Sequence, residues 1–394
     1  MGTVARRREP SLLLGAAGFC TNMSWQVILP ILPLHLAHLG FDVSQVGLVV
    51  GVFSLTMGVV ELQAGVIAVA VGRRAALLGA LAAHAVCLGI GGWGHARGLV
   101  AAAFAAAGAT RGVLVPPLHA TVADSAPAER RGRAFGVFWL CTSLASFAGP
   151  ALGGFVASHA GGGAPFAVAA LFSLAAIPLL ATWGVPGRAA RGAVTVDFAA
   201  FLRSPSVTRL GVSMLLCYSL AGIWTTFLPL YAARQGISVV TIGWIFAIQG
   251  GAYALMQVPT GRLAALGHGR WLAAAGIAVM AGTVLAVPLV RGGSLLAAGA
   301  FFGIGFGIMP VTFAMQFTQR VTPDLYTAAL SVYNSAIDLG LFAGPLLGAA
   351  VAAAAGTVAA PFLLALPLGF AALAIGRRIP SGVTEPRPEQ ASPF

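Results

Sequence analysis

The chain has 394 residues, of which 58% are hydrophobic and only 8% are charged. A soluble domain devotes roughly 25% of its residues to charged side chains, so this composition excludes a soluble globular protein and indicates an integral membrane protein. At about 20 residues per span, roughly a dozen transmembrane helices fit into the length.

All 22 basic residues are arginine, and with 10 acidic residues they give a net charge of +12. The arginines are scattered between apolar segments and form no stripe interleaved with aromatic residues, which excludes nucleic acid as a partner and favours the lipid bilayer. The cysteines lack metal-ligand spacing, and we expect neither a metal nor a cofactor. They lie inside apolar runs, at Cys20, Cys87, Cys141 and Cys217.

Apolar runs between arginine, glycine and proline predict six spans in the first half of the chain. These are residues 11–37, 44–66, 75–93, 98–122, 134–157 and 165–184. The second half gives six more, at 207–231, 239–260, 271–290, 295–317, 326–352 and 358–376. The predicted units are a tail (1–10), a six-helix bundle (11–184), a polar linker (185–206), a second bundle (207–376) and a tail (377–394).

The distribution of arginine predicts the orientation in the membrane. An even number of spans places both termini on one side, and that side holds 18 arginines. The opposite side holds three, at Arg97, Arg234 and Arg291. We therefore expect a multi-pass protein of the cell (inner) membrane with both termini in the cytoplasm.

An internal repeat relates the two halves. Residues 31–47 align with residues 227–243 at an offset of 196, with seven identities, and an offset of 195 carries residues 149–150 onto 344–345. A six-helix unit used twice in the same orientation is an arrangement that alternating-access transporters use. Over residues 10–376 the chain resembles the 12-helix members of the major facilitator superfamily, which implies an all-α fold of 12 transmembrane helices in two six-helix parallel repeats.

The loop after the second span resembles the family's Gly-x-Leu-x-Asp-Arg-x-Gly-Arg-Arg motif. The matching residues are Gly65, Gly72, Arg73 and Arg74. Val69 stands at the acidic position, which in the family belongs to an ion network that latches the two halves, so a weaker latch is implied. Asp124 is expected to pair with Arg73 or Arg74; the alternative is a plain basic turn that only sets topology.

The stretch "PAERRGRAFG", which contains Arg131 and Arg133, resembles the family's loop between helices 4 and 5, although the same residues also suit topology control.

Two Gly-Pro pairs stand inside apolar spans, in "SLASFAGPALGG" (143–154) and "DLGLFAGPLLGAA" (338–350). Glycines four residues apart clear a stripe on which another helix packs closely. The residues concerned are Gly149, Pro150 and Gly153, and Gly340, Gly344, Pro345 and Gly348. They resemble the signature of the family's exporters and antiporters, which implies packing against the opposite half; the alternative is an ordinary tight helix contact.

Ionisable groups inside the spans are costly and point to function. Glu61 and Asp338 lie on helices 2 and 11, which meet across the halves in the resembled fold. The family usually carries an arginine at the position of Phe104. Here Arg111 lies about two turns later on the same helix. The hypothesis is that Asp338, alone or with Glu61, carries a proton and that Arg111 is its electrostatic counterweight. His119 is a further candidate for coupling, and Glu61 has a purely structural alternative.

Polar and aromatic residues on helices 1, 7, 8 and 10 are candidates for substrate contact, with helix–helix hydrogen bonding as the alternative. They are Asn22, Trp25, Gln26, Tyr218, Trp224, Gln249, Tyr253 and Gln316.

The function implied is secondary active transport by a monomer, not enzymatic catalysis, because the chain carries no nucleophile elbow, zinc motif or phosphate-binding loop. Resemblance to the drug:proton antiporter branch implies proton-coupled efflux of small amphipathic or drug-like compounds. The alternatives are proton-coupled transport of a sugar or other metabolite, and a transporter-like sensor that moves nothing.

Overall fold

The computed structural model describes residues 10–127, 130–183, 205–319 and 326–378, with the side chains of Pro10, Trp183 and residues 326–331 left aside. The predicted linker, 185–206, therefore falls outside the described residues except for its last two positions. The predicted tails also fall outside them, apart from Pro10, Arg377 and Arg378.

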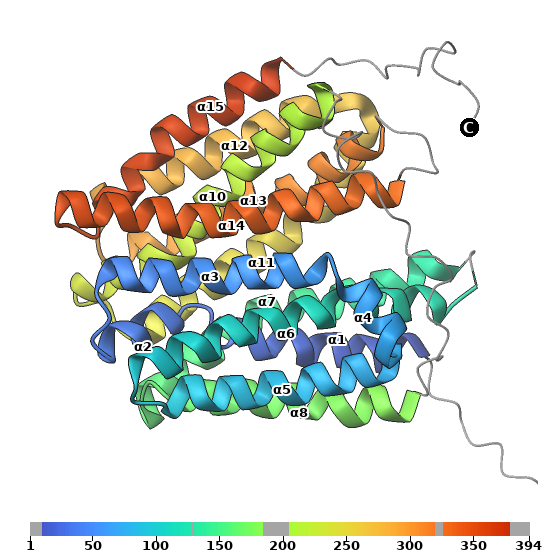
Figure 1. Ribbon diagram of the computed structural model, residues 1–394. Helices are drawn as coiled ribbons and strands as arrows, with labels where there is room; N and C mark the ends of the chain where they lie inside the picture. Colours follow the sequence, from blue (N-terminus) through green and yellow to red (C-terminus); the bar gives the residue numbers. More distant parts are fainter. Residues whose placement is uncertain (1–9, 128–129, 184–204, 320–325, 379–394) are drawn as a thin grey trace, which may run out of the picture.

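The first half forms a bundle of helices, the lower one in Figure 1. Its helices are α1 (Pro10–Gln26), α2 (Leu32–His38), α3 (Val43–Glu61), α4 (Ala64–Val71), α5 (Arg73–Trp93), α6 (Arg97–Asp124), α7 (Arg131–Ala160) and α8 (Ala164–Trp183).

The second half forms the upper bundle. Its helices are α10 (Pro205–Arg234), α11 (Val239–Leu263), the π-helical turn η2 (Ala264–His268), α12 (Gly269–Ala286), η3 (Val287–Leu289), α13 (Ser294–Thr318), α14 (Tyr326–Ala355), η5 (Ala360–Leu364) and α15 (Ala365–Arg377).

Within the described residues, 10 helical stretches are long and apolar enough to cross a membrane. One of them, Val239–Leu289, covers two predicted spans, so these stretches account for every predicted span but the first. The first span corresponds to α1 and α2 together. The prediction of an all-α membrane protein built from two helical bundles is confirmed.

The first two predicted spans are interrupted where the sequence predicted continuous helices. Between α1 and α2 the chain passes through Pro30, which has no amide hydrogen for a helical bond. The next break follows Glu61, and α4 then occupies much of the stretch that was predicted to be a loop. Gly72 ends α4 with a φ of +86°, a conformation that glycine adopts without strain and that lets α5 begin at the next residue.

The Gly-Pro pairs, in contrast, do not interrupt their helices. α7 continues through Pro150 and α14 continues through Pro345. Each proline removes one backbone hydrogen bond, and close packing of neighbouring helices over the site tolerates that loss.

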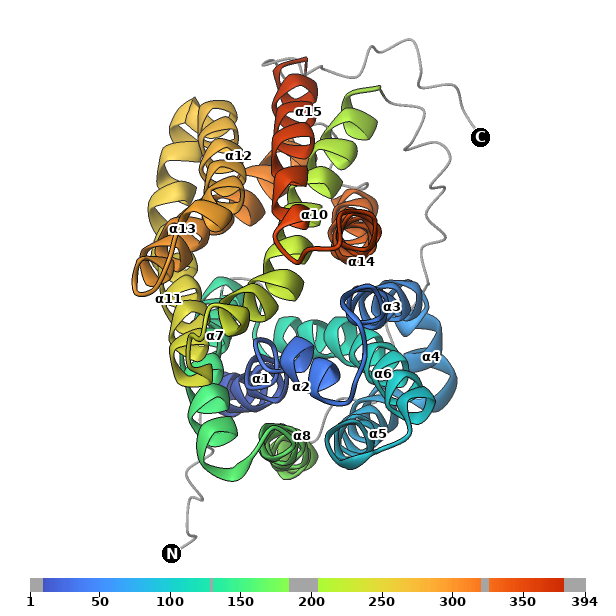
Figure 2. The same cartoon turned by 90° about the vertical axis from the view of Figure 1, so that its left-hand side faces the viewer.

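The two halves meet along two pairs of helices, α7 with α11 and α14 with α3 (Figure 2). An added Cβ on Gly243 would lie 2.6 Å from the Pro150 carbonyl oxygen, and one on Gly47 would lie 2.7 Å from that of Pro345. The repeat relates these contacts, because Gly47 and Gly243 are 196 positions apart and the prolines are 195 apart. Backbone therefore touches backbone at equivalent places in both halves.

Both contacts lie near the end of the molecule opposite the termini. Gly47 and Gly243 lie in the first turns of α3 and α11, and Gly154, which also touches Gly243, lies in the last two turns of α7. Toward the ends that hold Pro10 and Arg377, α12 and α15 slope away from the lower bundle (Figure 1). The backbone contacts of Gly47 and Gly243 therefore join the halves at the end away from the termini.

The glycine stripes themselves pack inside each half, which corrects the prediction that they face the opposite half. An added Cβ on Gly153 would overlap the Val27 carbonyl oxygen beside α1, and one on Gly344 would overlap that of Ser219 in α10. The contact with the other half comes from the Pro150 carbonyl oxygen and from Gly154, one residue further along α7 than Gly153. One residue turns the direction by about 100° around a helix, so spacing alone did not identify the partner.

Alanine at Gly243 should separate the two halves at this contact. In an open helix position, glycine to alanine stabilises by roughly 1 kcal/mol, but at Gly243 the new Cβ would overlap the Pro150 carbonyl oxygen. We expect Gly243→Ala to lower the apparent melting temperature of the purified protein. The matched control is Gly282→Ala in α12, where nothing lies within 4 Å of the added Cβ, and it should hold or raise that temperature. Equal effects of the two substitutions would contradict the contact.

Candidate functional site

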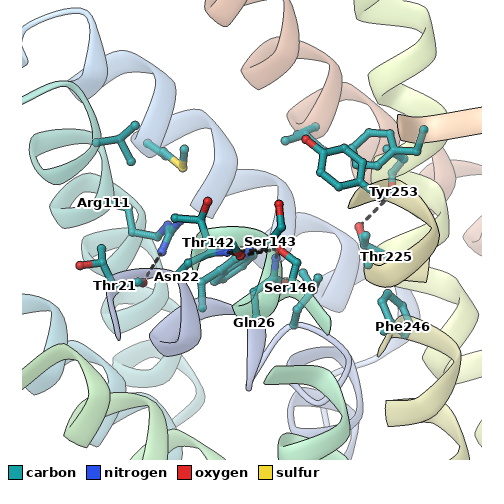
Figure 3. Close-up of a pocket in the computed structure, with 18 of the residues that line it drawn as sticks. Thr21, Asn22, Gln26, Arg111, Thr142, Ser143, Ser146, Thr225, Phe246 and Tyr253 are labelled. Carbon is teal, nitrogen blue, oxygen red and sulfur yellow. Dashed lines mark hydrogen bonds between the residues drawn. The ribbon is translucent and has the colours of Figure 1, made fainter. Parts of the chain in front are cut away.

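A cavity of about 410 Å³ lies between the two halves. Helices α1, α2, α3, α6 and α7 line it from the first half, and α10, α11, α13 and α14 from the second (Figure 3). Its volume falls within the usual range for sites that bind small molecules. The tight contacts of Gly47 and Gly243 close the molecule beyond the cavity, on the side away from the termini.

An aromatic pair and an arginine form the first-half wall. The rings of Trp25 and Phe53 are stacked, with centroids 4.3 Å apart and an angle of 9° between planes. The guanidinium carbon of Arg111 lies 5.5 Å from the centre of the Trp25 ring, within range of a cation–π interaction. Arg111 also donates a long hydrogen bond of 3.5 Å to the Thr21 carbonyl oxygen (Figure 3).

Two of the predicted substrate residues tie α1 to α7. The Asn22 amide donates to the Thr142 carbonyl oxygen at 2.7 Å and to the Ser146 hydroxyl at 3.1 Å. The Gln26 amide donates to the same hydroxyl at 2.9 Å. Both side chains line the cavity and make helix–helix hydrogen bonds, so the alternative interpretation is confirmed and substrate contact stays a prediction.

The second-half wall uses a different set of aromatic residues. Trp224 is completely buried, stacks on Phe302 with centroids 4.4 Å apart, and donates from its indole nitrogen to Gln249 at 2.7 Å. Gln249 and Tyr253 line the cavity.

Three predicted substrate residues do not line the cavity: Trp224, Tyr218 and Gln316. Trp224 and Tyr218 are buried in the core of the second half, where their rings pack on Phe302 and Phe306 respectively. The sequence placed these residues on the correct helices but did not indicate which face of each helix points inward.

Asp338 lies where α14 meets α3 and lines the cavity. It is 7% exposed, and an added Cβ on Gly58 would lie 2.7 Å from its own Cβ. No hydrogen bond or ion pair joins its carboxyl to another described residue. Glu61 lies outside the cavity lining, at the end of α3, and accepts a hydrogen bond of 3.5 Å from Asn334 of α14.

The other two coupling candidates line the cavity from α6. Arg111 and Asp338 belong to opposite walls, and no ion pair joins them in the described part of the chain. His119 packs against the rings of Phe138 and Trp139, with centroids 5.5 and 5.4 Å away.

The predicted latch residues lie at the end of the first half that carries the termini. Arg73 is buried and forms an ion pair with Asp124, whereas Arg74 donates to the Ala181 carbonyl oxygen at 3.0 Å. Both interactions stay within the first half. Gly65 has open space around it, and Arg131 and Arg133 are exposed at the start of α7.

Sequence reasoning missed the hydroxyl groups that α7 and α10 contribute to the cavity. They belong to Thr142, Ser143, Ser146 and Thr225. A usable signal was present. Thr142, Ser143 and Ser146 fall in a stretch of five residues inside an apolar span, shortly before Gly149-Pro150.

Two helical bundles with a cavity between them are an arrangement typical of membrane transporters. The chain matches the Major Facilitator Superfamily over residues 14–241 and again over residues 210–393, and it belongs to that superfamily. No curated protein was found to match the chain.

Solved structures of the same fold include transporters of several kinds. A mutant of the nucleoside transporter NupG aligns with a TM-score of 0.77 at 13% identity, over 94% of this chain and 98% of its own. The peptide transporter POT in complex with sulfate aligns with a TM-score of 0.75 at 14% identity, over 96% and 95%. A bacterial homologue of the human lysosomal transporter Spinster, inward-facing and unoccupied, aligns with a TM-score of 0.73 at 15% identity, over 96% and 94%. At these identities the similarity establishes the fold.

Removal of the Asp124 carboxylate should leave the buried Arg73 without its counter-ion. Asp124 is 43% exposed, so we expect Asp124→Asn to lower the free energy of unfolding by only about 1 kcal/mol. Exchanging the two residues, in the double variant Arg73→Asp with Asp124→Arg, should recover part of that loss. Arg74→Gln is the matched control, because Arg74 is exposed and should matter less. Melting of the purified protein measures all of them, and an Asp124→Asn variant as stable as the native protein would contradict the pair's importance.

Proposed function

We propose that the protein is a proton-coupled secondary transporter that exports small amphipathic compounds by alternating access. The observation that carries the proposal is a cavity between two repeat-related bundles, closed at one end by backbone contacts. At the joint between the halves it holds a carboxyl that is unpaired among the described residues. A transporter of this kind needs a central site and two halves that can tilt around it.

The contacts between the halves support alternating access. Gly243 meets backbone atoms of Pro150 and Gly154, and Gly47 meets the Pro345 carbonyl oxygen and Ala349, with the Phe227 ring beside it. Close backbone contacts of this kind leave few long side chains to repack when the two halves separate and meet again. The arginine distribution supports a cytoplasmic location for the termini, and the state described here then faces the cytoplasm. We propose that the protein works as a monomer in the cell membrane.

The position of Asp338 supports proton coupling. A carboxyl that is buried without a cation is more stable when it holds a proton, and a carboxyl exposed to water releases one. Asp338 lies on α14 against Gly58 of α3, so separation of these helices would expose it. Glu61 and Asn334 lie nearby, bonded across the same pair of helices, and provide the next polar groups toward the termini. The halves cannot tilt without changing the surroundings of Asp338.

The lining of the cavity supports an amphipathic substrate. Aromatic and aliphatic side chains dominate it, and Arg111 and Asp338 are its charged groups among the described residues, with His119 as a third titratable group. The direction rests on the Gly-Pro pairs that resemble those of exporters.

Uptake or efflux of a polar metabolite such as a sugar is the second candidate, because hydroxyl and amide groups of α7, α10 and α11 also line the cavity. In proteoliposomes the two differ in the direction of proton movement, since an antiporter moves protons against the substrate and a symporter moves them with it. A panel of lipophilic cations, sugars and amino acids, added under an imposed pH gradient, would identify the substrate and the direction in which protons move. A protein that moves nothing across the whole panel would be a sensor.

Asparagine at position 338 should uncouple the protein. It keeps the shape of the side chain but cannot gain or lose a proton in the working range of pH, so we expect Asp338→Asn to reduce substrate-driven proton flux by roughly tenfold or more. A pH-sensitive dye inside proteoliposomes measures this flux. Glu61→Gln should reduce it less, because Glu61 does not line the cavity.

The control for this experiment is Asp42→Asn at the start of α3. Asp42 accepts a hydrogen bond from the Gln45 backbone amide at 2.8 Å as a helix cap, and asparagine caps a helix about as well. Coupled flux in Asp42→Asn should match that of the native protein. If Asp338→Asn also keeps full coupled flux, Asp338 is not the proton carrier.

A further inference from the structure

Arg111 is a half-buried cation that makes few of the hydrogen bonds it is able to make. Its guanidinium carries five N–H donors, and among the described residues it makes one hydrogen bond, the 3.5 Å contact with the Thr21 carbonyl oxygen. No carboxylate of the described chain lies within 4.0 Å of it. The two acidic residues proposed for proton coupling, Glu61 of α3 and Asp338 of α14, form no ion pair with it.

This arginine lines the cavity and is held in place. The Trp25 ring lies 5.5 Å from its guanidinium carbon, and Trp25 is fixed by stacking on Phe53. In Figure 3 the side chain of Arg111 extends from α6 toward Thr21 of α1, at one end of the row of polar residues that leads to Ser146. A cation inside a membrane protein is costly unless an anion or water compensates it, so its remaining donors are available to a bound molecule.

We infer that Arg111 is an anion-binding subsite and that the transported compound is an aromatic monocarboxylate. The inference rests on the proposed transport function and names its substrate class. The planar guanidinium matches a carboxylate, which accepts two parallel hydrogen bonds from it. A second negative charge finds no partner, because the other charged residue in the described lining is the acidic Asp338.

The remaining walls of the cavity fit the apolar part of such a molecule. Phe246, Phe302, Phe306 and Tyr253 line the side contributed by the second half, opposite Arg111. A ligand that places its carboxylate on Arg111 extends its ring toward these side chains. Aromatic rings bury a large area and pack edge to face or offset on one another, which favours a flat substrate. The cavity volume of about 410 Å³ accommodates one small aromatic acid.

The inference is tested by equilibrium binding to the purified full-length protein, without a gradient, using three probes of matched size. These are 1-naphthoate, its neutral amide and 1-naphthylmethylammonium, with benzoate as a smaller acid. We expect 1-naphthoate to bind at least roughly 10-fold more tightly than the amide, as a charge-assisted pair of hydrogen bonds provides, and the cation to bind most weakly. Isothermal titration calorimetry measures the three dissociation constants.

Substitutions then assign the preference to one side chain. Arg111→Gln should remove the difference between acid and amide, and Arg111→Lys should keep part of it because it keeps the charge without the planar fork. Arg262→Gln is the matched control, the same change at an exposed arginine of α11 outside the cavity. Melting without ligand identifies any variant that fails to fold, and Arg111→Lys then carries the test.

Each other result overturns the inference. It fails if the amide or the cation binds as tightly as 1-naphthoate, if Arg111→Gln keeps the preference, or if neither aromatic acid binds. Tight binding of the cation alone would leave proton-coupled export standing with a different substrate class. Selective binding of 1-naphthoate without any flux in proteoliposomes would leave the anion site standing and remove the proposed transport. The two failures are therefore distinguishable.

Discussion

Direct contact between backbones of opposite halves is the constraint on which the rest of the structure depends. Where α7 meets α11 and α14 meets α3, glycine removes the side chains, and the helices approach until carbonyl oxygens touch the facing helix. Hydrocarbon does not drive helices together as water does, so close van der Waals packing of this kind supplies much of the attraction. Gly47 and Gly243 make these contacts toward the end away from the termini, and the cavity lies between the halves.

The polar residues of the spans serve two separate purposes, which their residue types alone do not distinguish. One set makes bonds inside a half, as Trp224 does with Gln249 in the second bundle and His84 does with Thr110 in the first. The other set stands at the cavity wall with bonding capacity to spare, as Arg111 does. A polar group without a partner is costly in an apolar medium, so the second set is where we expect a mobile molecule to supply the missing interaction.

The fold was predictable from the sequence because its main signals are long and repeated. Apolar runs of about 20 residues indicate spans without any knowledge of contacts, and the offset of 195 to 196 relates the halves. The site was predictable only in part. Trp25 and Trp224 carry the same ring, yet one lines the cavity and the other is in the core, because the face that points inward depends on how each helix is rotated in its bundle. Proline was equally ambiguous, since the chain breaks at Pro30 but continues as a helix through Pro229.

Ser146 joins features that otherwise lie in different parts of the molecule. Its hydroxyl accepts from Asn22 and Gln26 of α1 in the cavity wall, while its carbonyl oxygen lies so close to Gly250 of α11 that a Cβ there would overlap it. A ligand that draws either amide into its own hydrogen bonds loosens α1 from α7 at the residue on which the opposite half rests. In the proposed transport cycle, Ser146 therefore links occupancy of the cavity to the fit between the two halves.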